Sequence, residues 1–227
     1  MCLAIAHKGF WWPRRELQNH PDSVLGALTA GYGAEVDVWD VRDLRLVLRH
    51  DESSLEHELT PLLFMTGPLF LHAKGGNGGF PERLADTIRA WGRPDTYTFC
   101  SPSNDALLAT MRVASIKESP IKTLVPVDSL DRLTILLDQW DILGVADGVW
   151  LEQPETDWVD ADTIDNIKGA GKTVWIVSPE LHGRSLDLGR LAEWRTADGI
   201  CTDYPHLLVR VMDRDDVVVH PKEPWWE

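Results

Sequence analysis

The chain has 227 residues, of which 36 are acidic and 22 basic, and its formal net charge is -14. This charge gives no general attraction to nucleic acid or anionic lipid headgroups, so a nucleic-acid partner is not expected. An anionic substrate would need a bound cation or a few placed lysines to attract it, and the length fits one domain with one large core.

Short runs rich in Val, Ile, Leu and aromatic residues alternate with longer stretches compatible with helices, which is typical of a parallel β/α protein. The runs predict eight strands at residues 3–6, 34–39, 69–73, 96–100, 121–125, 148–151, 173–177 and 199–202. The stretches between them predict helices at residues 23–30, 84–91, 104–113, 129–140, 162–168 and 186–194. Ser129 and Asp162 are cap-type residues expected to open two of these helices.

The strands are apolar along their whole length rather than alternating, and helices separate most of them. This pattern favours a single TIM-type (β/α)8 barrel over an open sheet. A ninth run, residues 44–48, is expected to pair beside the second strand. Residues 52–68 offer at most a brief helix, so we expect a barrel trimmed around its third unit. Residues 1–210 form the predicted barrel, and residues 211–227 form a C-terminal appendage of the same domain.

The three cysteines, Cys2, Cys100 and Cys201, are widely spaced in or beside apolar runs, which predicts buried free thiols. His7 and Lys8 interrupt the apolar start of the chain, so no secretion signal is predicted. No apolar run approaches the ~20 residues of a membrane span. We therefore expect a soluble, cytoplasmic protein. The sequence does not specify an oligomeric state.

Working groups of a parallel barrel lie at the carboxyl ends of its strands. The first four such groups are His7 and Lys8, Glu35 and Asp37, His50 and Asp51 after the ninth run, and His72 and Lys74. Later strand ends supply Ser101, Asp128, Glu152, Ser178, Glu180 and Asp203.

Glu35 and Asp37 are two positions apart on a strand, so their side chains share one face and converge. Buried carboxylates this close favour a bound hard cation such as Mg²⁺ or Ca²⁺. The alternative is a pair of carboxylates bonded to neighbouring backbone or to Lys8 without an ion.

His7 and His50 flank this carboxylate pair at neighbouring strand ends. Phosphodiester cleavage needs one base for the nucleophile and one acid for the leaving oxygen, and imidazole can fill either role. A single histidine at a strand end is more often structural. Two beside an E-x-D pattern favour metal-dependent phosphodiester cleavage.

Five short motifs resemble those of the glycerophosphodiester phosphodiesterase family, H-R-G, E-N, G-x-x-E-x-D, H-D and D-G-x-x-T-D-x-P, in the same order. They lie at residues 6–9, 18–19, 33–38, 48–51 and 198–205, and residues 174–177 resemble the V-W-x-V of its seventh strand. The resemblance implies a TIM barrel in which His7 and His50 are the acid and base pair, while Glu35 and Asp37 hold a divalent ion. It also assigns substrate or phosphate contacts to Lys8, Asn19, Lys74 and Trp175.

The chain departs from the family pattern at three residues, and its segment between His50 and His72 is shorter than usual. His72 replaces the third metal carboxylate, the glutamate of E-x-K, so the third ligand is an imidazole or is missing. Divergent members that resemble this chain also carry His-Ala-Lys here. Imidazole suits Mn²⁺, Zn²⁺ or Fe²⁺ better than Mg²⁺ or Ca²⁺. Lys8 replaces an arginine and lacks its two-pronged grip on phosphate, and Ser178 replaces an asparagine.

The expected activity is a metal-dependent phosphodiesterase acting on a small glycerophosphodiester-like or lysophospholipid-type substrate. Attack by a neighbouring substrate hydroxyl would instead release a cyclic phosphate. A catalytically silent barrel that binds a phosphorylated ligand is a second interpretation, although a binder gains little from two histidines. An aldolase or isomerase would rest on fold analogy alone.

Several further residues carry weaker interpretations. Trp11 and Trp12 lie outside any periodic segment, in a stretch rich in Pro and Arg, and could wall a binding cleft. Glu180 is read either as a group near the substrate or as part of a solvated loop, as are Glu152 and His182. Asp203 is expected to brace the last strand and turn rather than contact the substrate.

Overall fold

Eight parallel strands close into a barrel in this computed structural model, which describes residues 2–41, 45–51, 54–75, 79–92, 95–100, 121–138 and 144–213. The barrel strands are β1 (Leu3–Ala6), β2 (Gly33–Asp40), β5 (Leu69–Gly75), β6 (Thr96–Cys100), β7 (Ile121–Val127), β8 (Gly148–Leu151), β9 (Thr173–Val177) and β10 (Gly199–Thr202). The first strand pairs with β2 on one side and with β10 on the other. This closure confirms the predicted TIM-type barrel.

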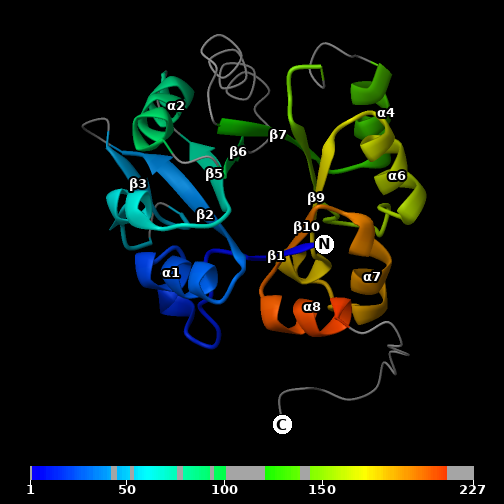
Figure 1. The fold of residues 1–227 in the computed structure, drawn as a ribbon, viewed down its shortest axis with the longest axis horizontal. Coiled ribbons are helices and arrows are strands. Elements are labelled where there is room, and N and C mark those ends of the chain that lie inside the picture. Colours follow the sequence, from blue (N-terminus) through cyan, green and yellow to red (C-terminus); the bar gives the residue numbers. More distant parts are fainter. Residues whose placement is uncertain are drawn as a thin grey trace.

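The outer face of the barrel is covered by helices (Figure 1). They are α1 (Pro21–Thr29), α2 (Phe80–Trp91), α4 (Leu130–Asp138), α6 (Ala161–Gly169), α7 (Leu188–Glu193) and α8 (Pro205–Met212), with short 3-10 turns η1 (Arg15–Leu17), η3 (Thr60–Phe64), η4 (Pro179–His182) and η5 (Trp194–Thr196). In this view (Figure 1) α1 and α2 lie on the side of β2, α4, α6 and α7 lie on the opposite side, and α8 packs against β1 and β10. The predicted helix at residues 104–113 lies outside the described residues. The sequence interpretation gave no helix at α8, whose buried face includes Leu208 and Val211.

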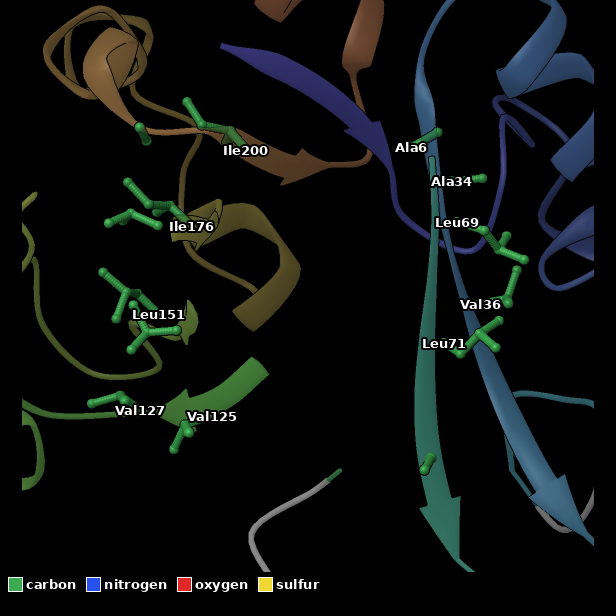
Figure 2. Close-up of a cluster of buried hydrophobic side chains, with 14 of the residues drawn as sticks. Ala6, Ala34, Val36, Leu69, Leu71, Val125, Val127, Leu151, Ile176 and Ile200 are labelled. Carbon is green, nitrogen blue, oxygen red and sulfur yellow. The ribbon is translucent and has the colours of Figure 1, made fainter. Parts of the chain in front are cut away.

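Strand residues alternate between the helices and the barrel interior, and both faces are buried, which explains their continuous apolarity. Figure 2 shows the outward set, in which Leu151 and Ile176 point away from Val36 and Leu71 on the opposite side of the barrel. The helices pack against these side chains, so the larger hydrophobic core lies between sheet and helices.

A second apolar cluster fills the barrel itself. We call its five aromatic members the aromatic plug: Phe70, Tyr97, Phe99, Trp150 and Trp175. The rings of Phe70 and Tyr97 stack at 4.6 Å, and those of Phe99 and Trp150 stack at 4.2 Å. The interior is therefore a packed core rather than a pore.

The connection from β2 to β5 contains no α-helix in its described part, as the trimmed unit predicted. A short antiparallel extension, β3 (Leu46–Leu48) and β4 (His57–Glu58), pairs beside β2, and η3 follows. The pairing confirms the predicted ninth run. Its turn brings Arg49 back to the second strand, where its backbone N–H donates to the Asp37 carbonyl at 3.3 Å. This return path places His50 beside the barrel mouth.

Two helix starts test the predicted caps. The Ser129 hydroxyl accepts from the backbone N–H of Arg132 at 3.4 Å, consistent with a cap before α4. The prediction for Asp162 was wrong by two residues. Asp160 is the N-cap of α6, and its carboxylate accepts from the Thr163 N–H at 2.8 Å.

The division at residue 210 stays a prediction, because residues 214–227 lie outside the described chain. The helix α8 continues through residue 210 and buries Val211.

None of the helices in the described ranges has the length and apolar character of a membrane span. Cys2 and Cys201 are free thiols, and burial raises the pKa of Cys201 well above its ordinary value. The cytoplasmic location stays a prediction.

Candidate active site

Two strand carboxylates and an imidazole meet at the carboxyl end of the barrel. Glu35 and Asp37 point inward from β2 and are almost completely buried, at 2% and 1% exposure. His72 lies on β5 directly opposite Asp37 in the strand register. Its Nδ1 atom is 3.6 Å from Glu35 Oε1 and 3.5 Å from Asp37 Oδ1. The three side chains offer ligand atoms within 4.8 Å of one another, so they could hold a metal ion together.

Two residues after β1 with unusual backbone conformations form hydrogen bonds with these carboxylates. Lys8 and Asn19 have left-handed φ values of 55° and 58°, which are uncommon for non-glycine residues. The Lys8 N–H donates to Glu35 Oε2 at 3.1 Å. The Asn19 amide donates to Asp37 Oδ2 at 3.0 Å and accepts from the Asp37 N–H at 2.8 Å. Such conformations persist only where the surroundings hold them, and they concentrate at functional sites.

One oxygen of the Asp37 carboxylate is placed where it could bind a cation. Asp37 Oδ1 is buried and accepts no hydrogen bond from the described residues. It is 3.5 Å from Lys74 Nζ and 3.5 Å from His72 Nδ1. A buried carboxylate oxygen left without a donor is costly unless a cation lies close to it. The donor set of two carboxylates and one imidazole therefore fits a divalent ion.

Positive groups around Asp37 control its protonation. Burial by itself would raise the pKa of this carboxyl, because the charged form loses its hydration. The hydrogen bond with His50 and the charges of Lys74, His72 and Lys8 outweigh burial, and the pKa lies well below its ordinary value. Asp37 is therefore ionised and available as a ligand.

His50 reaches the same carboxylate from the solvent side. Its Nδ1 atom is 3.2 Å from Asp37 Oδ2, and 46% of its side chain is exposed. The exposure leaves the other ring nitrogen accessible to a substrate.

His7 lies on the opposite flank of the carboxylate pair. Its Nε2 atom is 4.0 Å from Glu35 Oε2, and its Nδ1 atom is 2.8 Å from Asp203 Oδ1. The sequence interpretation treated Asp203 only as a brace for its turn. The signal that could have found this contact is barrel closure, which makes the first and last strands neighbours.

Glu180 lies behind Asp203 and is partly buried rather than solvated. Its carboxylate accepts from the hydroxyls of Ser178 and Thr202 and from the Asp203 N–H. Burial raises the pKa of Glu180, and these hydrogen bonds only partly oppose the rise. Burial also lowers the pKa of the neighbouring His182.

The structure brings eight of the nine predicted site residues together. These are His7, Lys8, Asn19, Glu35, Asp37, His50, His72 and Lys74. The ninth, Trp175, lies deeper in the aromatic plug, where its indole N–H donates to Thr173 at 2.9 Å. Trp11 is buried, and its indole donates to the His7 carbonyl. Trp12 is 47% exposed and lies against Tyr204.

Comparisons with known proteins agree with this architecture. No protein-family model and no curated protein matches the sequence. A solved structure from Galdieria sulphuraria, assigned as a glycerophosphodiester phosphodiesterase, is similar with a TM-score of 0.73 and 15% identity, covering 94% of this chain and 98% of that one. A glycerophosphodiester phosphodiesterase from Agrobacterium tumefaciens gives 0.64 and 18%, covering 92% and 100%.

The chain has the fold of these glycerophosphodiester phosphodiesterases. The fold that the motif resemblance implies is thus confirmed. A 2,3-dimethylmalate lyase is also similar, with a TM-score of 0.55 and 16% identity over 92% of this chain and 79% of that one. Because barrels of similar fold carry different reactions, the chemistry must be argued from the site.

Proposed function

We propose that this protein is a metal-dependent phosphodiesterase that cleaves a small glycerophosphodiester-like or lysophospholipid-type substrate. The observation that supports this proposal best is the meeting of Glu35, Asp37 and His72, with His7 on one flank and His50 on the other. A purely structural cluster has no need for two histidines that each contact a carboxylate.

Glu35, Asp37 and His72 would hold the divalent ion in this proposal. Bound there, the ion would supply positive charge for a phosphoryl oxygen. Lys8 and Lys74 lie beside the same carboxylates, with their Nζ atoms 4.0 Å and 3.5 Å from Asp37. They provide the local positive charge that attracts an anionic substrate to this acidic protein.

The two histidines carry the proton transfers. Each places Nδ1 against a carboxylate, Asp203 for His7 and Asp37 for His50, so Nε2 is the atom left to exchange a proton. One ring accepts the proton of the nucleophile, and the other donates a proton to the leaving oxygen. Water as nucleophile gives hydrolysis, whereas a hydroxyl of the substrate gives a cyclic phosphate.

The ring of His72 is held for metal binding by the aromatic plug. It stacks on Phe99 with centroids 4.5 Å apart. Two hard carboxylates with one imidazole favour Mn²⁺, Zn²⁺ or Fe²⁺ more than three carboxylates would, while the carboxylates remain suitable ligands for Mg²⁺ and Ca²⁺.

The test uses metal-stripped protein with bis(4-nitrophenyl) phosphate, glycerophosphodiesters and lysophospholipids, adding Mg²⁺, Ca²⁺, Mn²⁺ or Zn²⁺ singly. We expect metal-dependent turnover that falls roughly 10²- to 10⁴-fold in His7→Ala and in His50→Ala. His206→Ala is the matched control. This histidine lies on α8 and packs against Phe10, and its Nδ1 makes no hydrogen bond within the described residues.

Phosphorus NMR of the products separates hydrolysis from release of a cyclic phosphate. Binding of the phosphodiesters without turnover in any metal would contradict the enzyme proposal. It would instead support a silent binding barrel.

A further inference from the structure

Barrel closure places one carboxylate directly against His7. Asp203 follows β10, and His7 follows β1, so 196 positions in the sequence separate two side chains whose Oδ1 and Nδ1 atoms are 2.8 Å apart. The strand pairing also holds the backbone of the histidine, because the His7 N–H donates to the Thr202 carbonyl at 3.1 Å. Both the ring and the backbone of His7 are thus held by the end of β10.

The backbone of Asp203 is in turn held by a hydrogen bond to Glu180. The Asp203 N–H donates to Glu180 Oε1 at 3.2 Å, and the Thr202 hydroxyl donates to the same oxygen. The second oxygen accepts from Ser178. The Thr202 hydroxyl oxygen also accepts the Tyr204 N–H at 3.1 Å, which fixes the turn on both sides of Asp203. Glu180 comes from η4, so its carboxylate ties the segment after β9 to the end of β10.

This chain of contacts determines which nitrogen of His7 carries the proton. A carboxylate can only accept a hydrogen bond, so the neutral ring must carry its proton on Nδ1. The Nε2 atom then keeps its lone pair on the side of Glu35, 4.0 Å away. Among the described residues, the side chain of Asp203 makes its hydrogen bond to His7 alone, whereas Asp37 is shared between His50, Asn19, His72 and two lysines.

We propose that Asp203 is a positioning residue that fixes the tautomer and orientation of His7, and that Glu180 anchors Asp203 for this purpose. The role in catalysis rests on the proposed phosphodiesterase function. The role in fixing the tautomer does not, because it follows from the ring contacts alone. The two parts can therefore be tested separately.

The first measurement is the tautomer of His7 in protein labelled with ¹⁵N-histidine, recorded at about pH 8.5, above the ordinary pKa of imidazole. A His7→Ala variant identifies the resonance. We expect the Nδ1–H form in the native chain and a mixture rich in the Nε2–H form in Asp203→Ala. Asp162→Asn, which changes an exposed carboxylate on α6, is the control expected to keep the native form. An unchanged His7 tautomer in folded Asp203→Ala would overturn the proposal.

Glu180 gives a second pair of variants that leave Asp203 in place. Glu180→Gln keeps an oxygen for Asp203 and Thr202 and can donate its amide to the Ser178 hydroxyl, so we expect the native tautomer. Glu180→Ala removes every one of these acceptors, and we expect a mixed tautomer. If both variants keep the native form, the anchoring role is wrong. Where Asp203→Ala does not fold, this pair still tests the anchoring role of Glu180.

The kinetic arm uses bis(4-nitrophenyl) phosphate. For Asp203→Ala we expect kcat to fall roughly 10²- to 10³-fold with KM within about 3-fold, because proton transfer is impaired while substrate contacts remain. Loss through KM alone would contradict positioning of His7. Absence of turnover in the native chain would contradict the proposed function only, since the tautomer measurement still reports on Asp203.

Discussion

The two halves of the barrel interior differ sharply along the same strands. On β5, Phe70 belongs to the aromatic plug, while the next inward residues, His72 and Lys74, contact the buried carboxylates. On β1, Ile5 lies in the plug and His7 in the candidate site. A step of two residues therefore separates a position that stabilises the fold from one that carries chemistry.

Glycines make the difference possible at the amino end. A Cβ atom at Gly33 would lie 3.2 Å from the Phe70 ring, and one at Gly199 would lie 2.8 Å from the Trp175 ring. The aromatic rings thus occupy space that the facing strands leave free. Farther along β2, the inward positions carry Glu35 and Asp37, and the neighbouring His72 stacks on Phe99 of the plug. The amino end of the interior is thus a packed aromatic core, and the charged side chains gather at the carboxyl end.

The largest expected effect is at the charged end, in Asp37→Asn. The amide keeps the shape and still accepts from Asn19, but it removes the negative charge that Lys8, Lys74 and a divalent ion require. We expect Mn²⁺ affinity and kcat to fall by at least about 10²- to 10³-fold. Isothermal titration with Mn²⁺ and turnover of bis(4-nitrophenyl) phosphate measure the two losses. Asp162→Asn serves again as the control, and an unchanged Mn²⁺ affinity would show that Asp37 is not a ligand.

The next effect is at the aromatic end, in Phe70→Ala. Phe70 is fully buried and contacts Tyr97 and Trp175, so its removal leaves a cavity. We expect the free energy of unfolding to fall by about 3 to 5 kcal/mol. Urea denaturation measures this loss. Mn²⁺ affinity of the folded variant should stay within a few-fold of the native value. A large loss of Mn²⁺ affinity with little change in the free energy of unfolding would contradict the assignment of stability to the aromatic end and of metal binding to the charged end.

A smaller effect is expected where the halves meet, at His72. His72→Glu supplies a third carboxylate, so the ratio of Zn²⁺ or Mn²⁺ affinity to Mg²⁺ affinity should fall by about 10-fold. His72→Ala should weaken every ion. Competition titrations against a metal indicator measure these ratios without relying on activity. Unchanged metal affinity in His72→Ala would show that the imidazole is not a ligand.

Much of the barrel could be predicted from the sequence, because a strand buried on both faces leaves a plain apolar run. Five of the eight strands have the predicted bounds, as in β1 (Leu3–Ala6) and β9 (Thr173–Val177). Helix ends were less accurate. Asp160 and Asp162 are both cap-type residues, and only the path of the loop decides which one accepts from Thr163. The predicted grouping of Glu35 and Asp37 followed from strand geometry alone.

The remaining parts depend on tertiary contacts that local patterns do not contain. The contact between His7 and Asp203 needs the barrel to close, and the burial of Glu180 needs its loop to fold against β10. For Trp175 the motif predicted a role that its position in the barrel does not indicate. Its motif predicted a substrate contact, but the inward position on β9 packs it among Phe70 and Tyr97.

The smallest expected effect is on the pH dependence of stability, which should change in a Glu180 variant but not in a variant of the aromatic end. Burial raises the pKa of this carboxyl above its ordinary value of 4.5, so the folded state binds more protons than the unfolded state between the two values. The contribution of Glu180 to stability therefore falls as pH rises through that window. Glu180→Gln removes the titration, so its stability should decline less with rising pH than that of the native chain. Urea denaturation across this range measures the difference. Phe70→Ala should lower stability equally at every pH in the window, because no titrating group is removed. Parallel curves for the native chain and Glu180→Gln would show that the carboxyl is solvated.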